Sequence, residues 1–238
     1  MKRPRSKSTL GSRPRRRGWI VATLFWCLTL LIGLHAVFAA SLLYLRFFNP
    51  ITTGVQIQRR VGALFAGKPY QKRSEFVPIS KISPNLIHAV IAAEDGRFYQ
   101  HSGIDWQQVQ KVVSQSMETG EVSRGASTLT QQLVKNLFFT THRNPVRKLL
   151  EYTVAPMATV ILGRNRILEL YLNVVEWGPG VFGAEAASQY HYHSHASRLD
   201  RDQAARLAAC LPAPLRWRPQ AMDQYSGIIE TRMTQLGW

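Results

Sequence analysis

The chain has 238 residues and a formal net charge of +16 at neutral pH. Eight basic residues lie within the first 17 positions, and the first acidic residue is Glu75. A basic arm before an uncharged span is a membrane-topology signal, so the charge does not indicate nucleic-acid binding. Two cysteines are too few for a disulfide framework.

The basic arm (residues 1–18) precedes a run without charged residues from Trp19 to Leu45. About 20 apolar residues suffice to cross a bilayer, so we expect a transmembrane anchor over 19–45. The charge bias predicts a cytoplasmic N-terminus and an extracytoplasmic body. A cleavable signal peptide with a site near Ala39 is the alternative, although its apolar region would be unusually long.

Residues 46–78 are interpreted as a juxtamembrane connector with little regular structure. Its basic side chains would lie near the outer membrane face, where they could meet lipid headgroups, although a merely solvated linker explains them equally well. These side chains are Arg59, Arg60, Lys68, Lys72 and Arg73.

The remaining body, residues 79–238, is predicted to be mainly α-helical, with no convincing alternating β segment and a turn-rich loop over 177–183. Pro156 is expected to kink or interrupt a helix, and a last helix is expected over about 222–236. Trp106 and Cys210 are expected to lie in the core. The expected helix starts are Ser83-Pro84, Asp105, Ser127, Asn144-Pro145 and Asp200.

Glu94 stands out because it falls in the last turn of the helix that begins at Ser83-Pro84, just before Gly96. A helix C-terminus carries partial negative charge, which tends to raise the pKa of a carboxylate there. Such a group suits a general base. A solvated helix end with chance acidic residues is the alternative.

Two further segments carry candidate chemistry. Residues 125–136 join a glycine-bearing loop to a helix N-terminus, which suits phosphate binding, although a well-capped polar helix explains the same residues. Arg147 and Lys148 precede Glu151 on the next helix. An ordinary Arg147–Glu151 pair, worth only a few tenths of a kcal/mol, accounts for that spacing equally well.

The ordered set of motifs is more specific than any single motif. It reads Glu-Asp-x-x-Phe-x-x-His-x-Gly, Gly-x-Ser-Thr-x-Thr-Gln-Gln-x-x-Lys-Asn, Arg-Lys-x-x-Glu and Ile-Leu-x-x-Tyr-Leu-Asn. In these residues, over roughly 80–215, the chain resembles the peptidoglycan glycosyltransferase family (glycosyltransferase family 51), especially its monofunctional members. The sequence contains no Ser-x-x-Lys, so no transpeptidase activity is expected.

The resemblance implies a lysozyme-like helical fold and the polymerisation of lipid II into β-1,4-linked glycan strands with release of undecaprenyl pyrophosphate. It implies that Glu94 is the general base and that Glu151 orients the donor or holds a divalent cation. The substrate- and pyrophosphate-binding residues that it implies are Ser127, Thr128, Gln131, Gln132, Lys135, Asn136, Arg147 and Lys148. The residues expected to shape the first motif are Asp95, Phe98, His101 and Gly103.

The resemblance also implies partners and a location. The partners are lipid II, the growing glycan strand, membrane lipid, and proteins of cell-wall synthesis and division. The expected location is the bacterial inner membrane, crossed once, with a periplasmic catalytic domain. No cofactor is expected to be obligatory, with Mg²⁺ or Mn²⁺ an optional ligand of Glu151.

The chain departs from the family pattern after the glycine-rich loop. Many relatives carry Tyr-Phe-x-Lys where this chain has His191-Tyr192-His193-Ser194, which puts any phosphate contact of that lysine in doubt. His191, His193 and His195 are assigned no role, since their spacing alone does not make a metal site. A wall hydrolase of related fold and a non-catalytic scaffold remain the rival readings.

Overall fold

The computed structural model describes residues 15–120, 125–142 and 144–238, with the side chains of 15–17 left out. Most of the basic arm predicted over residues 1–18 therefore lies outside the described residues. Contacts divide the chain into two units, Met1–Ala40 and Ser41–Trp238, and each is described by itself.

The first unit is dominated by helix α1 (Arg15–Phe47), which continues into the second. Residues Gly18–Phe47 are long and apolar enough to cross a membrane, with a mean hydropathy of 2.2. Large apolar side chains such as Trp19 and Leu30 are exposed. A helix with an apolar surface of this kind is consistent with the anchor expected over 19–45, and a signal sequence would share this character.

The second unit is mainly helical, which confirms the expected fold class of the body. Short 3₁₀ turns lie at Ile79–Lys81, Phe98–Gln100, Ala196–Arg198 and Pro219–Ala221. Its helices after α1 are α2 (Gly54–Phe65), α3 (Pro84–Glu94), α4 (Trp106–Thr119), α5 (Leu129–Phe138), α6 (Pro145–Leu162), α7 (Arg164–Val174), α8 (Ala184–Tyr192), α9 (Arg201–Cys210) and α10 (Asp223–Gln235).

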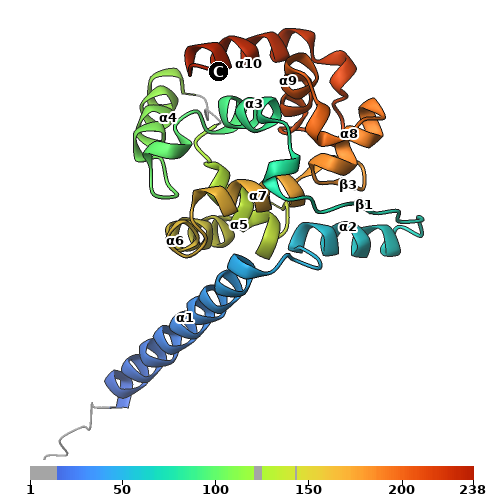
Figure 1. Ribbon diagram of the computed structural model, residues 1–238. Helices are drawn as coiled ribbons and strands as arrows, with labels where there is room; N and C mark the ends of the chain where they lie inside the picture. The colour runs from blue at the N-terminus through green and yellow to red at the C-terminus, as the bar shows by residue number, and fades with distance from the viewer. Residues whose placement is uncertain (1–14, 121–124, 143) are drawn as a thin grey trace, which may run out of the picture. The chain divides into compact units, whose positions relative to one another are not determined.

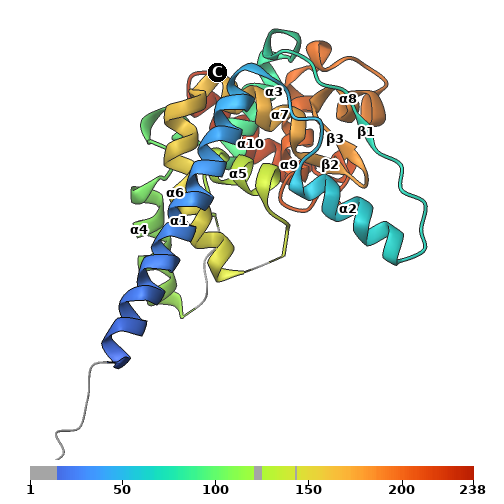
Figure 2. The same ribbon diagram turned by 90° about the horizontal axis from the view of Figure 1, so that it is seen from below.

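Six of these helices form two groups (Figure 1). In the first, α3, α9 and α10 pack against one another; in the second, α5 packs against α6 and α7, and α6 against α7. Figure 2 shows the second group from below, with α5 and α6 on the near side. The end of α3 carries Glu94 from one group toward the start of α5 in the other, and this junction builds the site.

Capping residues begin most of the helices where the sequence predicts. Ser83, Asp105, Asn144 and Asp200 each accept a hydrogen bond from a backbone N–H of the first turn. The expected start of α5 was wrong by one residue. Its N-cap is Thr128, not Ser127, because Thr128 and Gln131 form a reciprocal capping box.

A small sheet corrects the expectation that the body has no strands. The strands are β1 (Arg73–Ser74), β2 (Glu176–Gly178) and β3 (Val181–Phe182), in the order β1-β3-β2. β1 pairs parallel with β3, and β2 pairs antiparallel with it. The turn-rich loop over 177–183 is therefore partly a hairpin.

The segment 46–78 is also more ordered than expected. It contains α2, which packs against α5, and the strand β1. The side chain of Arg59 on α2 forms an ion pair with the buried Glu176 at 2.8 Å. The domain boundary expected at residue 79 stays a prediction.

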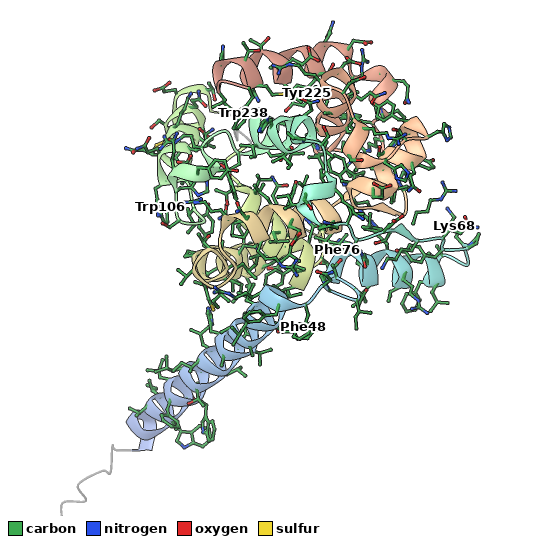
Figure 3. The ribbon with its side chains drawn as sticks, viewed as in Figure 1. Phe48, Lys68, Phe76, Trp106, Tyr225 and Trp238 are labelled. Carbon is green, nitrogen blue, oxygen red and sulfur yellow. The ribbon has the colours of Figure 1, made fainter. Side chains whose placement is uncertain are left out.

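Burial agrees with the sequence for Cys210 and differs for Trp106. Cys210 is buried, and burial raises the pKa of its thiol to about 12. Trp106 is 65% exposed, and Figure 3 labels it on α4. The reason is that α4 buries none of its residues; the Trp106 ring stacks on Tyr152 of α6 instead. Pro156 lies inside α6 without interrupting it.

Candidate functional site

Glu94 is the last residue of α3, as the sequence predicts, and it lines a pocket of about 470 Å³. The N-terminal approach to α5 forms one wall of this pocket, with Ser127 and Thr128. Tyr225 and Arg232 of α10 form another. The carboxylate is thus presented to a cavity rather than solvated at a free helix end.

Two side chains hold the Glu94 carboxylate in a fixed orientation. The Gln132 amide nitrogen on α5 donates a hydrogen bond to Glu94 Oε2 at 2.6 Å. The Tyr171 hydroxyl on α7 donates to the carbonyl oxygen of the same amide at 3.1 Å. Tyr171 is fully buried. A chain of two hydrogen bonds therefore runs from the core of the second helix group to the carboxylate at the end of α3.

Burial raises the pKa of Glu94 above its ordinary value of 4.5. The hydrogen bond from Gln132 and the charge of Lys135 act in the opposite direction, whereas the charge of Asp95 acts with burial. A carboxylate with a raised pKa is a stronger base than a solvated one, and it can remove a proton from a hydroxyl group in the pocket.

Lys135 connects Glu94 with a cluster of charges on α6. Burial lowers the pKa of the Lys135 ammonium below 10.5, and the negative charges of Glu151 and Glu94 oppose this effect. Together with Gln132 and Asn136, it lines a second pocket of about 580 Å³. Glu94 lines the first pocket and Gln132 lines the second, so the hydrogen bond between these two side chains connects the two pockets.

Arg147, Lys148 and Glu151 meet on one face of α6. Arg147 Nε lies 3.3 Å from Glu151 Oε1, and Lys148 Nζ lies 3.0 Å from Glu151 Oε2. Lys148 also donates to Ser127 Oγ at 2.9 Å, which ties the cluster to the wall of the Glu94 pocket. The Glu151 carboxylate is buried, so it is enclosed by cations rather than solvated. The arrangement can attract an anionic group.

The residues expected to shape the first motif contact backbone and one another. Asp95 accepts from His101 Nε2 at 2.9 Å, and Phe98 is fully buried. Gly103 has φ +94, and a Cβ there would lie 2.7 Å from the carbonyl oxygen of Ala155. A side chain at this position would meet both a backbone clash and a disfavoured conformation.

Arg164 on α7 also contacts this loop. Its guanidinium donates to the carbonyl oxygen of Phe98 and, at 2.5 Å, to that of His101. Two carbonyl groups of the segment that follows Glu94 are therefore satisfied by one side chain of α7.

Three residues predicted to bind substrate make hydrogen bonds within the protein instead. Gln131 is fully buried in the capping box, which removes it from the pocket walls. Thr128 lines the Glu94 pocket, yet its hydroxyl donates to the Gly103 carbonyl at 2.6 Å. Asn136 lines the second pocket and donates to the Gln132 carbonyl at 2.8 Å. The structure thus gives Gln131 a structural position, because the capping box needs its side chain at N3.

The residues around Glu151 do not fit a protein-held divalent cation. Mg²⁺ sites collect several oxygen ligands, whereas Glu151 is flanked by two cationic side chains. In the described part of the chain, no three His, Cys, Asp or Glu residues lie close enough to hold a metal ion. The histidines near α8 instead make local contacts, such as His195 Nδ1 with Glu185 Oε1 at 2.7 Å.

Sequence reasoning missed several residues of the Glu94 surroundings, among them Tyr171, Tyr225 and Arg232. Tyr171 lies inside the fourth motif, but nothing in the sequence connects it to Gln132. Tyr225 and Arg232 lie outside every motif (Figure 3 labels Tyr225). Their spacing of seven residues puts both on one face of α10, which is the only signal that could have paired them.

Comparisons with known proteins identify the family of the chain. The family model described as "Transglycosylase" matches residues 60–235. A biosynthetic peptidoglycan transglycosylase of Pseudomonas entomophila (strain L48) is 44% identical over 202 residues, covering 83% of this chain and 85% of that protein. The protein of the same name from Laribacter hongkongensis (strain HLHK9) is 38% identical over 219 residues, covering 90% and 96%.

The matched segment spans the whole site, from before Glu94 on α3 to α10. The lysozyme-like helical fold expected from the motifs accords with the helix content of the second unit. This chain therefore belongs to the transglycosylase family, a family of peptidoglycan glycosyltransferases.

Proposed function

We propose that the protein polymerises lipid II into β-1,4-linked glycan strands, with Glu94 as the general base and without transpeptidase activity. The single observation that carries this proposal is the closeness of Glu94 to the cations: it lines one pocket with Ser127, which Lys148 contacts, and its charge interacts with that of Lys135. A base for a sugar hydroxyl and cations for a pyrophosphate are the two groups that such a transfer needs.

In the proposed step, Glu94 removes the proton from the 4-hydroxyl of the acceptor's terminal GlcNAc. The hydroxyl oxygen forms a bond with the anomeric carbon of the donor strand. The bond between that carbon and the pyrophosphate oxygen breaks, and its electron pair leaves with undecaprenyl pyrophosphate. The configuration at the anomeric carbon is inverted, which gives the β-1,4 link. The proton on Glu94 is then released to solvent.

Negative charge grows on the pyrophosphate oxygens as that bond breaks. Lys135, Arg147 and Lys148 supply positive charge at the cluster around Glu151. Fixed cations of this kind act on the transition state more than on the bound substrate, because the leaving group carries less charge before the bond breaks. The proposed role of Glu151 is to hold Arg147 and Lys148 in position beside the donor.

The charge cluster disfavours a wall hydrolase. A hydrolase of the lysozyme kind needs a protonated carboxyl to donate to a sugar oxygen leaving group, and it has little use for three clustered cations. A non-catalytic scaffold would not need a carboxylate held in a pocket by two successive hydrogen bonds.

We further propose that the protein crosses the bacterial inner membrane once through α1, with its N-terminus in the cytoplasm and its catalytic domain in the periplasm. The apolar helix Gly18–Phe47 supports the anchor, and the basic arm before it supports the orientation. An anchored enzyme stays beside a substrate whose polyprenyl tail remains in the bilayer. Protease added to intact spheroplasts should digest the body; resistance of the body would contradict the orientation.

The function is tested by incubating the purified full-length protein with lipid II and separating the products by size. Long glycan strands are expected from the unaltered protein, and none from Glu94→Gln. Glu118→Gln, an exposed glutamate on α4, is the matched control and should polymerise normally. Short muropeptides released from isolated cell wall would instead indicate a hydrolase, and polymer made by Glu94→Gln would refute Glu94 as the base.

A further inference from the structure

The hydroxyl of Tyr171 determines which end of the Gln132 amide faces Glu94. An amide has a donor end and an acceptor end of nearly equal size, so packing alone does not choose between them. The Tyr171 O–H donates to Gln132 Oε1 at 3.1 Å, which leaves the amide N–H group facing the carboxylate at 2.6 Å. The opposite orientation would set a carbonyl oxygen against an anion and leave the hydroxyl facing an amide donor.

We propose that Tyr171 is a positioning residue of this enzyme, which keeps Glu94 available as a base by fixing the Gln132 amide. The proposal rests on the proposed function, since it assumes that Glu94 removes the proton. It adds a residue on α7 to a site otherwise built from α3, α5, α6 and α10.

Tyr171 is suited to this role because its hydroxyl stays protonated. Burial raises the pKa of this phenol well above its ordinary value of 10.0, and the negative charge of Glu94 adds to the effect. The group is therefore a donor over the whole working pH range. The aromatic ring is fully buried, so its position does not depend on substrate.

The hydrogen bond from Gln132, which Tyr171 fixes, opposes the effect of burial on the pKa of Glu94. A hydrogen bond to the ionised carboxylate favours the ionised form, and the other groups around it act in both directions. Lys135 on α5 favours the anion, whereas Asp95 on α3 disfavours it. From α10, Tyr225 faces the same carboxylate and is hydrogen-bonded to Arg232. Losing the fixed amide would remove one of the two described influences that keep Glu94 ionised.

The test is the pH dependence of polymerisation by the full-length Tyr171→Phe variant with lipid II. A base must be unprotonated, so a higher pKa of Glu94 moves the acid limb of kcat to higher pH. We expect a shift of about one pH unit, which is about tenfold in kcat below the limb, with KM nearly unchanged. Tyr192→Phe removes the hydroxyl of another tyrosine, whose described contact is with the Gln203 carbonyl at 3.4 Å, and should leave the limb in place.

A double variant separates positioning from a general loss of stability. If Tyr171 acts through Gln132, then Tyr171→Phe adds nothing to the loss caused by Gln132→Met, whereas independent effects would multiply. An unmoved acid limb in a folded Tyr171→Phe protein, or multiplying losses in the double variant, would overturn the proposal.

The outcome also distinguishes this proposal from the proposed function. If the unaltered protein polymerises lipid II, Glu94→Gln does not, and Tyr171→Phe keeps the original acid limb, then only the positioning role fails. If Glu94→Gln still makes polymer, the assignment of the base fails, and the positioning role fails with it. Thermal unfolding of each variant in the same detergent shows whether it is folded before its kinetics are compared.

Discussion

The carboxylate of Asp95 accepts a hydrogen bond from the backbone N–H of Leu129 at 2.9 Å. Asp95 directly follows Glu94, and Leu129 is the first residue of α5, so this bond ties the end of one helix to the start of the other. The same carboxylate also accepts from His101. The residue beside the proposed base thus joins the two helix groups that form the site.

Replacing Asp95 should therefore weaken the junction. Asp95→Ala leaves the Leu129 N–H and His101 without their partner in a buried place, which we expect to destabilise the fold by about 2–4 kcal/mol. Thermal unfolding in detergent measures the loss. Asp202→Ala, an exposed acid paired with Arg206, should cost less than about 1 kcal/mol. Equal losses in the two variants would contradict the special position of Asp95.

The cation cluster should affect the reaction more than the fold. Lys148→Ala removes the ammonium that contacts both Ser127 and Glu151, and we expect kcat to fall by about 10²–10³-fold, as for the loss of one transition-state contact. Initial rates of lipid II polymerisation give this value. Lys111→Ala, an exposed lysine on α4, is the control. A change in KM alone would mean that Lys148 binds substrate and transition state equally.

The pH range in which the protein polymerises lipid II should be limited by Glu94 on the acid side and by Lys135 on the basic side. Glu94 must be unprotonated, and burial raises its pKa above 4.5, so activity should rise only above the ordinary range of a glutamate. Lys135 must be protonated, and burial lowers its pKa below 10.5, so activity should fall earlier on the basic side than for an exposed lysine. Measuring kcat from acid to alkaline pH tests both limbs. In Lys135→Arg the basic limb should disappear, because arginine stays charged.

Two glycines with opposite surroundings provide a matched test of backbone geometry. Gly103→Ala places a Cβ against the Ala155 carbonyl at a φ of +94, and we expect it to destabilise the fold by about 2 kcal/mol or more. Gly227 lies inside α10 with open space around its Cα, so Gly227→Ala should stabilise by about 0.5–1 kcal/mol. Thermal unfolding of both variants would reveal these opposite signs.

Local rules of sequence predicted much of this arrangement. The cap at Ser83, the apolar stripe after it and Gly96 were enough to put Glu94 at a helix end. The same rules explain the error at α5. Ser127 and Thr128 both carry a hydroxyl, but only Thr128 has a glutamine three residues later to complete a capping box.

Contacts between distant segments could not be predicted in this way. Tyr171 and Gln132 are 39 residues apart, and only the packing of α7 on α5 brings them together. The strand β1 has two residues, too few for an alternating pattern, and its partner β3 begins more than a hundred residues later. Trp106 is exposed because α4 buries none of its residues, and hydrophobic periodicity does not reveal whether a helix is covered by its neighbours.

Because Cys210 is buried, spectroscopic labels could be attached at chosen positions of the body without reacting at Cys210. A thiol whose pKa is raised to about 12 by burial holds almost no reactive thiolate at neutral pH, and the sequence contains only one other cysteine, Cys27 in α1. Cys27→Ser should thus give a body that alkylating reagents leave untouched. Single cysteines introduced at exposed positions around the two pockets could then carry a fluorophore or spin label, so that binding at each pocket could be followed separately.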